Sequence, residues 1–309
     1  MTNGVNLSID EILRLRAVTH ELALPKSQRV RSLLAGGYMS AFRGRGMEFD
    51  EVRPYQAGDD VRTIDWRITA RTTQTYTKLF REERERPVML IIDQNATMKF
   101  GSRQAFKSIT AARIASMIAW AASASGDRIG ALIFDDERHS EIRPVAGKRG
   151  VIRLASTLID YANKLQYSQQ AHTPPWQAAL ARAHRTIHPG SHVIFISDFR
   201  EPNDMSEKHL TLLKQHNDIS LIHVYDVLEK QAPPPGQYTV SNGSVFRTLS
   251  FKKKSKLALQ PEYIEQTERF FDDMRRKHGL HTLQIATDTP LKEALFEAFR
   301  PKSRRSRHG

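Results

Sequence analysis

The sequence has 309 residues, of which 47 are lysine or arginine, 34 are aspartate or glutamate and none is cysteine. The lack of cysteine excludes disulfides, thiolate nucleophiles and cysteine-ligated zinc or iron–sulfur centres. The net charge is +13, but most of the excess lies in two short segments, Arg247–Lys256 and Arg300–Gly309, which favours a solvated loop and tail over a nucleic-acid-binding face.

The first expected element is an amphipathic helix over Ser8–Leu22, with Ser8 as its N-cap and Glu11 completing a capping box. The residues after it are dense in glycine, arginine and aspartate and show little periodicity. We therefore expect residues 1–86 to form this helix and a small β-containing subdomain. The N-terminus has no apolar signal-peptide core, and no segment approaches the ~20 apolar residues of a membrane helix. These features predict a cytoplasmic protein that makes no contact with a membrane.

From Pro87 onward, short apolar runs alternate with segments of helical period, which predicts an α/β domain over residues 87–299 with a doubly wound, mainly parallel sheet. The expected strands are Val88–Ile92, Ile129–Phe134, Glu141–Val145 as a polar edge strand, His192–Ser197, Ile219–Tyr225 and Leu280–Ala286. The expected helices are Ser102–Ser125, Arg149–Lys164, Trp176–Ile187, Ser206–His216, Glu262–His278 and Leu291–Phe299. Residues 231–250 interrupt this alternation with a proline-rich break and an Asn-Gly turn, which predicts a hairpin, and residues 300–309 form a basic tail.

Oxygen-bearing side chains follow two of the expected strands. Asp93 comes directly after the first strand, with Asn95 and Thr97 at alternating positions, and Asp198 comes directly after the strand His192–Ser197. Because the carboxyl ends of parallel strands meet at one edge of a sheet, we expect these side chains to converge. Such oxygen ligands suit Mg²⁺, which keeps several of its waters. In the competing interpretation, the same residues only cap helices and bond to loop amides.

The pattern Asp93-x-Asn95-x-Thr97, a later Thr173 that opens a helix, and Asp198 resembles the metal-ion-dependent adhesion site of von Willebrand factor A domains. That motif has the form Asp-x-Ser-x-Ser followed by a Thr and an Asp, so Asn95 stands where a hydroxyl residue is usual. The resemblance implies a von Willebrand factor A-like fold in which these five residues hold a metal ion, with Mg²⁺ as the cofactor. In such domains the metal keeps one position open, and a partner's carboxylate fills it.

A second set of motifs narrows the resemblance. It runs from Glu48-Phe49 through Gly58-Asp59 to Asp65-Trp66-x-x-x-Ala70-Arg71, and Glu83-x-Glu85-Arg86-Pro87 then leads into the strand with Asp93. These motifs are similar to those of an uncharacterised, von Willebrand factor A-like bacterial family, domain of unknown function fifty-eight, which is commonly encoded beside MoxR-type AAA+ ATPases. The resemblance implies a non-catalytic adaptor that works with such an ATPase in assembling or activating other protein complexes.

Charged residues of both signs crowd the segment from residue 53 to residue 71. Bidentate arginine–carboxylate pairs would fix the geometry of a loop-rich subdomain. We favour this structural role over catalysis because the segment contains no serine, cysteine or histidine. A partner-docking surface is compatible with the same residues. The candidates for partner binding are Arg53, Asp59, Arg62, Asp65, Trp66 and Arg71.

Two other functions compete with the adaptor. The run Asp93-x-Asn95-x-Thr97 after a buried strand is also similar to that of haloacid-dehalogenase-type phosphotransferases, in which Asp93 would be the nucleophile of a Mg²⁺-dependent phosphohydrolase. Asn95, however, cannot serve as the general acid. The basic segments offer the second alternative, nucleic-acid binding with a steep salt dependence. We predict that the chain is not an enzyme, and that its partners are a MoxR-type ATPase and proteins that present an acidic residue to the metal site.

Overall fold

The computed structural model describes residues 4–19, 22, 24, 47–56, 58–72, 74–82, 87–163, 175–200, 202–231, 233–241, 246–251 and 261–300. The chain divides into two compact units, Met1–Gln28 with Arg86–Gly309, and Arg29–Glu85. Thr173 and most of the two basic segments lie outside the described residues, so their predicted roles stay predictions. No helix within the described ranges is long and apolar enough to cross a bilayer.

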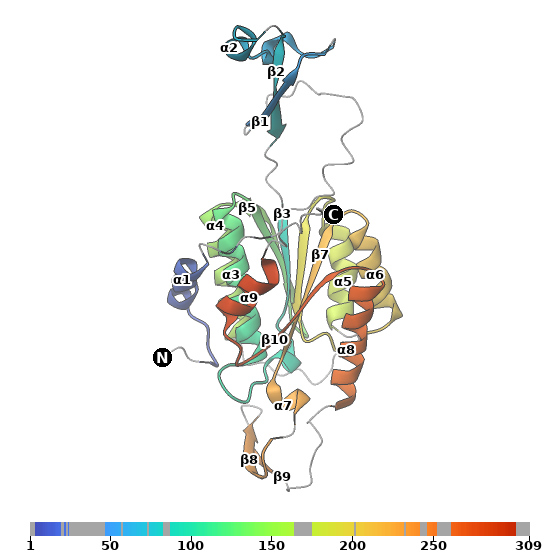
Figure 1. Ribbon diagram of the computed structural model, residues 1–309. Coiled ribbons are helices and arrows are strands. Elements are labelled where there is room, and N and C mark those ends of the chain that lie inside the picture. The colour runs from blue at the N-terminus through green and yellow to red at the C-terminus, as the bar shows by residue number, and fades with distance from the viewer. Residues whose placement is uncertain are drawn as a thin grey trace. The chain divides into compact units, whose positions relative to one another are not determined.

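A six-stranded sheet forms the centre of the larger unit (Figure 1). Its strands, in spatial order, are β10 (His281–Ala286), β7 (Asp218–Tyr225), β6 (His192–Ser197), β3 (Pro87–Asp93), β4 (Arg128–Phe134) and β5 (His139–Ala146). The first five strands run parallel, and β5 runs antiparallel to β4 at the edge. The structure therefore confirms the predicted α/β class and its mainly parallel sheet.

Helices cover both faces of this sheet (Figure 1). On one side lie α1 (Ile9–Val18), α3 (Lys107–Ala124), α4 (Lys148–Ala162) and α9 (Leu291–Phe299), and on the other lie α5 (Pro175–Thr186), α6 (Asp204–Lys214) and α8 (Pro261–Arg276). The period of two along a strand decides which layer receives each side chain. In β3, Leu90 and Ile92 enter the first core, whereas Met89 and Ile91 enter the second. Burial on both faces explains why the strand is a continuous apolar run.

The central helix α3 begins later than the sequence predicts. The periodicity places its start at Ser102, but the backbone N–H and the hydroxyl of Ser102 both donate to the Asp226 carboxylate. The helix therefore starts at Lys107, and almost all of its residues are buried. It ends just before Gly126, which has a φ of 80°, a value that glycine adopts without steric cost.

Helix α1 belongs to the larger unit, although its place in the sequence groups it with the small N-terminal subdomain. It packs on α3, where the indole Nε1 of Trp120 donates to the carbonyl of Ile12 at 2.9 Å. Ser8 accepts a hydrogen bond from the Glu11 N–H at 3.2 Å, which confirms the predicted N-cap. The Glu11 carboxylate pairs with Arg113 of α3. Contacts distant in sequence thus fix the position of this helix.

The smaller unit contains an antiparallel pair of strands, β1 (Met47–Pro54) and β2 (Tyr76–Glu82), with two short helical turns between them, η2 (Val61–Thr63) and α2 (Trp66–Thr69). In the larger unit, a further turn, η3 (Ala96–Met98), follows β3, and a short helix, α7 (Val227–Lys230), follows β7. Strands β8 (Gly236–Ser241) and β9 (Phe246–Phe251) form the hairpin that the Asn-Gly turn predicts.

Candidate functional site

The carboxyl edge of the sheet carries an acidic side chain at or just after the end of each of its five parallel strands. These residues are Asp93, Asp135, Asp198, Asp226 and Asp288. Two of them, Asp93 and Asp198, are the carboxylates that the sequence singles out. The other three also follow strand segments, and the strand-end rule applied to every expected strand would have found them.

Four of the five predicted metal ligands come together at this edge. The Thr97 hydroxyl oxygen lies 2.7 Å from Asp198 Oδ2 and 2.6 Å from Asn95 Oδ1. Asp93 Oδ1 accepts the Asn95 N–H at 3.0 Å, and Asp93 Oδ2 accepts the Ser197 hydroxyl at 2.6 Å. Both carboxylates are fully buried. These hydrogen bonds fasten the end of β3 to the end of β6.

A buried lysine lies within this cluster. Lys107 Nζ is 2.9 Å from Asp198 Oδ2 and 2.8 Å from Glu229 Oε1, and the Lys107 and Asp198 side chains are 0% exposed. Arg200 adds a second cation, with Nε 3.0 Å from Asp198 Oδ2 and Nη2 3.0 Å from Glu229 Oε1. Two cations and two carboxylates thus balance one another. Sequence reasoning missed Lys107 because lysine is almost always solvated and no local pattern marks this one as buried.

Aromatic packing holds the backbone beside Asp198. Phe199 has a φ of 50°, in the left-handed region, where a bulky residue is strained. Its ring is fully buried, and the ring centroid lies 5.0 Å from the centroid of Trp176 and 5.0 Å from that of Phe271, both in edge-to-face contacts. The Phe199 N–H also donates to the Ser197 hydroxyl at 2.9 Å. These contacts offset the strain and fix the direction of the Asp198 side chain.

Burial and charge shift the pKa values of the two carboxyl groups in opposite directions. Burial, reinforced by the neighbouring Asp198 charge, raises the pKa of Asp93 to about 8. Burial would also raise the pKa of Asp198, but the Lys107 and Arg200 cations outweigh it and hold that pKa well below its usual range. Near neutral pH the pair therefore carries close to one negative charge instead of two.

The oxygen atoms at this edge fit a divalent metal poorly. Mg²⁺ requires a near-octahedral shell of oxygen ligands. Both Asp93 oxygens and Asn95 Oδ1 already accept protein hydrogen bonds, and Asp198 Oδ2 faces two cations and a hydroxyl. Of the carboxylate oxygens of Asp93 and Asp198, only Asp198 Oδ1 is buried without a hydrogen-bond partner among the described residues. In the same part of the chain, no group of three or more His, Cys, Asp or Glu residues could hold a metal ion.

Three of the candidate docking residues in the smaller unit make contacts within that unit. Arg53 Nη2 lies 2.7 Å from Asp59 Oδ1, and Asp59 Oδ2 accepts the N–H of Gln56 in the turn between them. Asp65 caps α2 by accepting two backbone N–H groups, and its carboxylate lies 3.5 Å from Lys78 Nζ. Backbone hydrogen bonds lower the pKa of both aspartates. The structural interpretation therefore accounts for Arg53, Asp59 and Asp65.

The other three candidates, Arg62, Trp66 and Arg71, are exposed. The Trp66 side chain is the largest of them, and 68% of the residue is accessible to solvent. Val61, next to Arg62, is 61% exposed. In the described part of the chain, neither the Arg62 nor the Arg71 guanidinium forms an ion pair. We refer to Val61, Arg62, Trp66 and Arg71 together as the Trp66 surface.

Comparison with known proteins decides the family. A family model described as protein of unknown function DUF58 matches residues 51–270, from β1 of the smaller unit to α8 of the larger. The chain belongs to the DUF58 family. This confirms the recognition made from the motifs. Uncharacterized protein Mb1516 of Mycobacterium bovis and uncharacterized protein Rv1480 of Mycobacterium tuberculosis are each 26% identical to this DUF58 chain over 229 residues, covering 74% of it and 71% of the relative.

Solved structures match the DUF58 chain only weakly. The conserved hypothetical protein BatB from Bacteroides thetaiotaomicron gives a TM-score of 0.47 at 13% identity, covering 69% of this chain and 96% of BatB. An aerotolerance-related membrane protein from Bacteroides fragilis gives a TM-score of 0.46 at 14% identity, with the same coverage of 69% and 96%.

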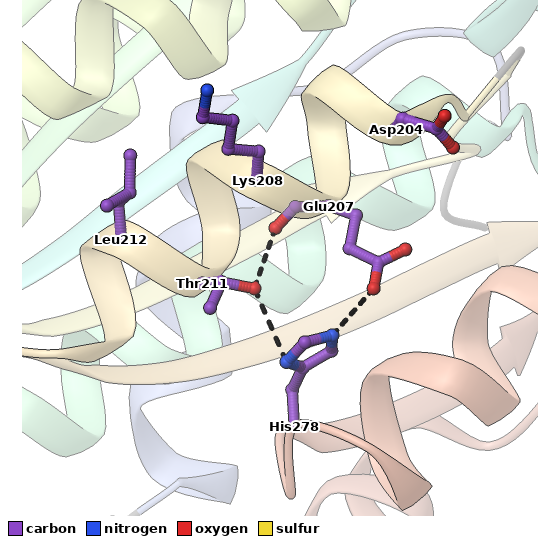
Figure 2. Close-up of a pocket in the computed structure, with 6 residues that line it drawn as sticks. All are labelled: Asp204, Glu207, Lys208, Thr211, Leu212 and His278. Carbon is purple, nitrogen blue, oxygen red and sulfur yellow. Dashed lines mark hydrogen bonds and ion pairs between the residues drawn. The ribbon is translucent and has the colours of Figure 1, made fainter.

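A pocket of about 380 Å³ on the larger unit of the DUF58 chain contains a second group of polar side chains (Figure 2). His278, which follows α8, lies between two residues of α6: its Nε2 is 2.7 Å from Glu207 Oε1 and its Nδ1 is 3.4 Å from the Thr211 hydroxyl. The Thr211 hydroxyl donates to the Glu207 carbonyl at 2.8 Å, so its proton is not directed at the imidazole. The group ties α8 to α6 and does not form a nucleophile–base pair.

Proposed function

We propose that this DUF58 chain is a non-catalytic interaction module that works with a MoxR-type AAA+ ATPase in assembling or activating other protein complexes. One observation carries the proposal. The Asp93 carboxyl group, which a phosphohydrolase would need as its nucleophile, is fully buried, and both of its oxygens accept hydrogen bonds. A phosphate ester would reach it only by breaking the packing of the edge. Family membership supports the partner, because this family is commonly encoded beside MoxR-type ATPases.

The Trp66 surface is the docking surface that the geometry favours. Tryptophan and arginine are enriched among the residues that dominate binding energy at interfaces. The exposed Trp66 and Val61 side chains offer apolar area, while Arg62 and Arg71 add positive charge. A complementary partner surface would surround an apolar pocket with carboxylates. We therefore expect the ATPase to present an acidic surface to this segment.

The carboxyl edge is the second candidate docking surface. If the resemblance to a metal-ion-dependent adhesion site extends to function, a Mg²⁺ ion held there would be reached by a partner carboxylate. Among the members of that ligand set that the structure describes, Thr97 is the one that is partly exposed. Thr97→Ala would remove its hydroxyl and so test this route without leaving a buried charge unpaired. The Mg²⁺-bridged contact stays a prediction that is distinct from docking through the Trp66 surface.

A binding experiment separates the two surfaces. The purified MoxR-type ATPase encoded in the same genome is immobilised, and the dissociation constants of the wild-type chain, Trp66→Ala and Thr97→Ala are measured with Mg²⁺ and nucleotide present. We expect Trp66→Ala to weaken binding about tenfold or more, as truncation of an interface hot spot does. Phe246→Ala is the matched control, because Phe246 lies in the β8–β9 hairpin and is 74% exposed.

Each outcome has a defined meaning. Loss of affinity in Trp66→Ala alone supports the Trp66 surface, and loss in Thr97→Ala alone moves docking to the carboxyl edge. Equal losses in Trp66→Ala and Phe246→Ala would show that the effect is not specific to the surface. Failure of the wild-type chain to bind the ATPase in any nucleotide state would contradict the proposed partnership.

A further inference from the structure

Lys107 is in an unusual position for a lysine. It is the first residue of α3, and its side chain points into the carboxyl edge, where it is 0% exposed. Burying an ammonium group is costly unless it is paired with opposite charge. Here Asp198 Oδ2 and Glu229 Oε1 lie at 2.9 Å and 2.8 Å from Nζ, so one cation bridges the end of β6 and the helix that follows β7. Bridging carboxylates from neighbouring strand ends is the task that a divalent cation performs in a metal-ion site.

We propose that the Lys107 ammonium takes the place of a divalent cation at this edge, so that the cluster of Asp198, Glu229, Arg200 and Thr97 is held together without a metal. This inference does not depend on docking through the Trp66 surface, but it excludes the Mg²⁺-bridged contact at the carboxyl edge. It adds a defined role for a residue that neither the motif nor the family match assigns.

The charge balance of the cluster supports this assignment. Lys107 and Arg200 oppose Asp198 and Glu229, so the four groups sum to zero. A Mg²⁺ ion added beside them would leave an excess of two positive charges next to the buried Lys107 and Asp198 side chains, and that arrangement is unfavourable. The cluster has no need of a second source of positive charge.

The donor atoms lead to the same conclusion. Asp198 Oδ2 accepts from Lys107, Arg200 and Thr97, which leaves little room for a metal on that oxygen. Asp198 Oδ1 is the carboxylate oxygen in the cluster that is buried without a partner among the described residues. A Mg²⁺ ion on this one oxygen would need water for the rest of its octahedral shell, whereas a single buried water would satisfy the oxygen itself.

Replacing the ammonium tests the proposal. In Lys107→Met, the two carboxylates keep only Arg200, so a divalent cation could enter between Asp198 and Glu229. We expect the melting temperature of Lys107→Met to fall in EDTA and to rise again with Mg²⁺ or Mn²⁺. The wild-type melting temperature should be the same in EDTA and in either metal. The matched control is Lys148→Met, because Lys148 is exposed at the start of α4, and it should behave as the wild type does.

Mn²⁺ binding gives a second measurement that does not require the variant to fold. The electron paramagnetic resonance signal of free Mn²⁺ decreases when the ion binds to the protein, so the amount bound can be read from it. Absence of bound Mn²⁺ on the wild-type chain supports the proposal. Bound Mn²⁺ on the wild type that Thr97→Ala releases would overturn it and restore the metal site that the sequence predicts. The proposal would also be overturned if Lys107→Met folds and its melting temperature is the same in EDTA, Mg²⁺ and Mn²⁺. The ammonium would then not be occupying the place of a divalent cation.

Discussion

His223 is a fully buried histidine of β7 whose hydrogen bonds fix its proton. The Tyr263 hydroxyl donates to the Asp198 carbonyl at 2.6 Å, so His223 Nε2, 3.1 Å from that hydroxyl, must be the donor in their contact. Nδ1 is buried without a hydrogen-bond partner among the described residues. Burial lowers the pKa of His223 from 6.5 to about 3; the Lys107, Lys230 and Arg200 charges add to the shift, and Asp198 opposes it.

This shift predicts a loss of stability in acid. Between pH 6.5 and about pH 3 the unfolded chain binds a proton on His223 that the folded chain does not, so the free energy of unfolding decreases as the pH falls. The group contributes a slope of up to about 1.4 kcal/mol per pH unit. Urea titrations of His223→Gln at about pH 5 and pH 7 should show a smaller difference than the wild type does. His139→Gln, at an exposed histidine, should keep the wild-type difference, and an unchanged slope in His223→Gln would contradict the prediction.

Asp198 allows a second test at the scale of one residue. Asp198→Asn removes the charge that two cations share at 2.9 Å and 3.0 Å, and leaves the buried Lys107 and the partly buried Arg200 with only Glu229. We expect a loss of about 3–5 kcal/mol in the free energy of unfolding, measured by urea denaturation. Asp160→Asn serves as the control, because that side chain is 62% exposed and its pair with Arg138 should contribute less than about 1 kcal/mol. Equal losses in the two variants would show that the cluster is not the cause.

Sequence reasoning found part of this cluster and missed the rest for a physical reason. Asp93, Asn95, Thr97 and Asp198 follow apolar strands, and strand ends can be recognised locally because the polarity changes abruptly there. Lys107 begins a helix at a position where a charged residue is ordinary, and only the tertiary fold shows that it is buried. Thus four of the five predicted ligands lie together, while the lysine that pairs Asp198 with Glu229 is visible only in three dimensions.

At the scale of elements, burial decides which features the sequence can predict. Strands of the sheet are covered on both faces, so each is a recognisable apolar run, and β3, β6 and β7 occupy nearly the expected residues. Helix ends are less predictable because tertiary contacts compete with local periodicity. The Asp226 carboxylate, which accepts from Ser102 and from Thr287, holds the segment before α3 out of the helix.

Helix α1 provides a test at this scale. Ser8 is the N-cap, and its hydroxyl accepts the N–H of Glu11 at 3.2 Å. We expect Ser8→Ala to lower the free energy of unfolding by about 0.5–2 kcal/mol, the usual cost of losing an N-cap. Hydrogen exchange should accelerate in the first turn of α1 before it does in α3. Ser125→Ala, at an exposed position after α3, is the control, and equal effects of the two substitutions would argue against a capping role for Ser8.

At the scale of the whole molecule, the sequence predicts the larger unit better than it predicts the smaller one. The α/β class follows from alternating periods, whereas the smaller unit, Arg29–Glu85, has too little periodicity for its strands and turns to be predicted individually. Only the structure shows which residues of the smaller unit are exposed. Asp59 and Asp65 make contacts within the unit, whereas Trp66 is exposed to solvent. Within the net charge of +13, Arg62 and Arg71 carry exposed positive charge in the segment that contains Trp66, and this local charge would attract the acidic surface that we propose for the ATPase.

This attraction predicts that association with the ATPase slows as salt rises, because screening shortens the reach of charge to about 10 Å at 0.1 M salt. Association rates measured by stopped flow over a salt series should fall steeply for the wild type. They should fall less steeply for the double variant Arg62→Glu/Arg71→Glu. The double variant Lys148→Glu/Arg149→Glu changes the net charge equally at exposed positions of α4 and should stay close to the wild type. If both double variants flatten the salt dependence to the same extent, net charge alone guides the encounter and the Trp66 surface has no special place in it.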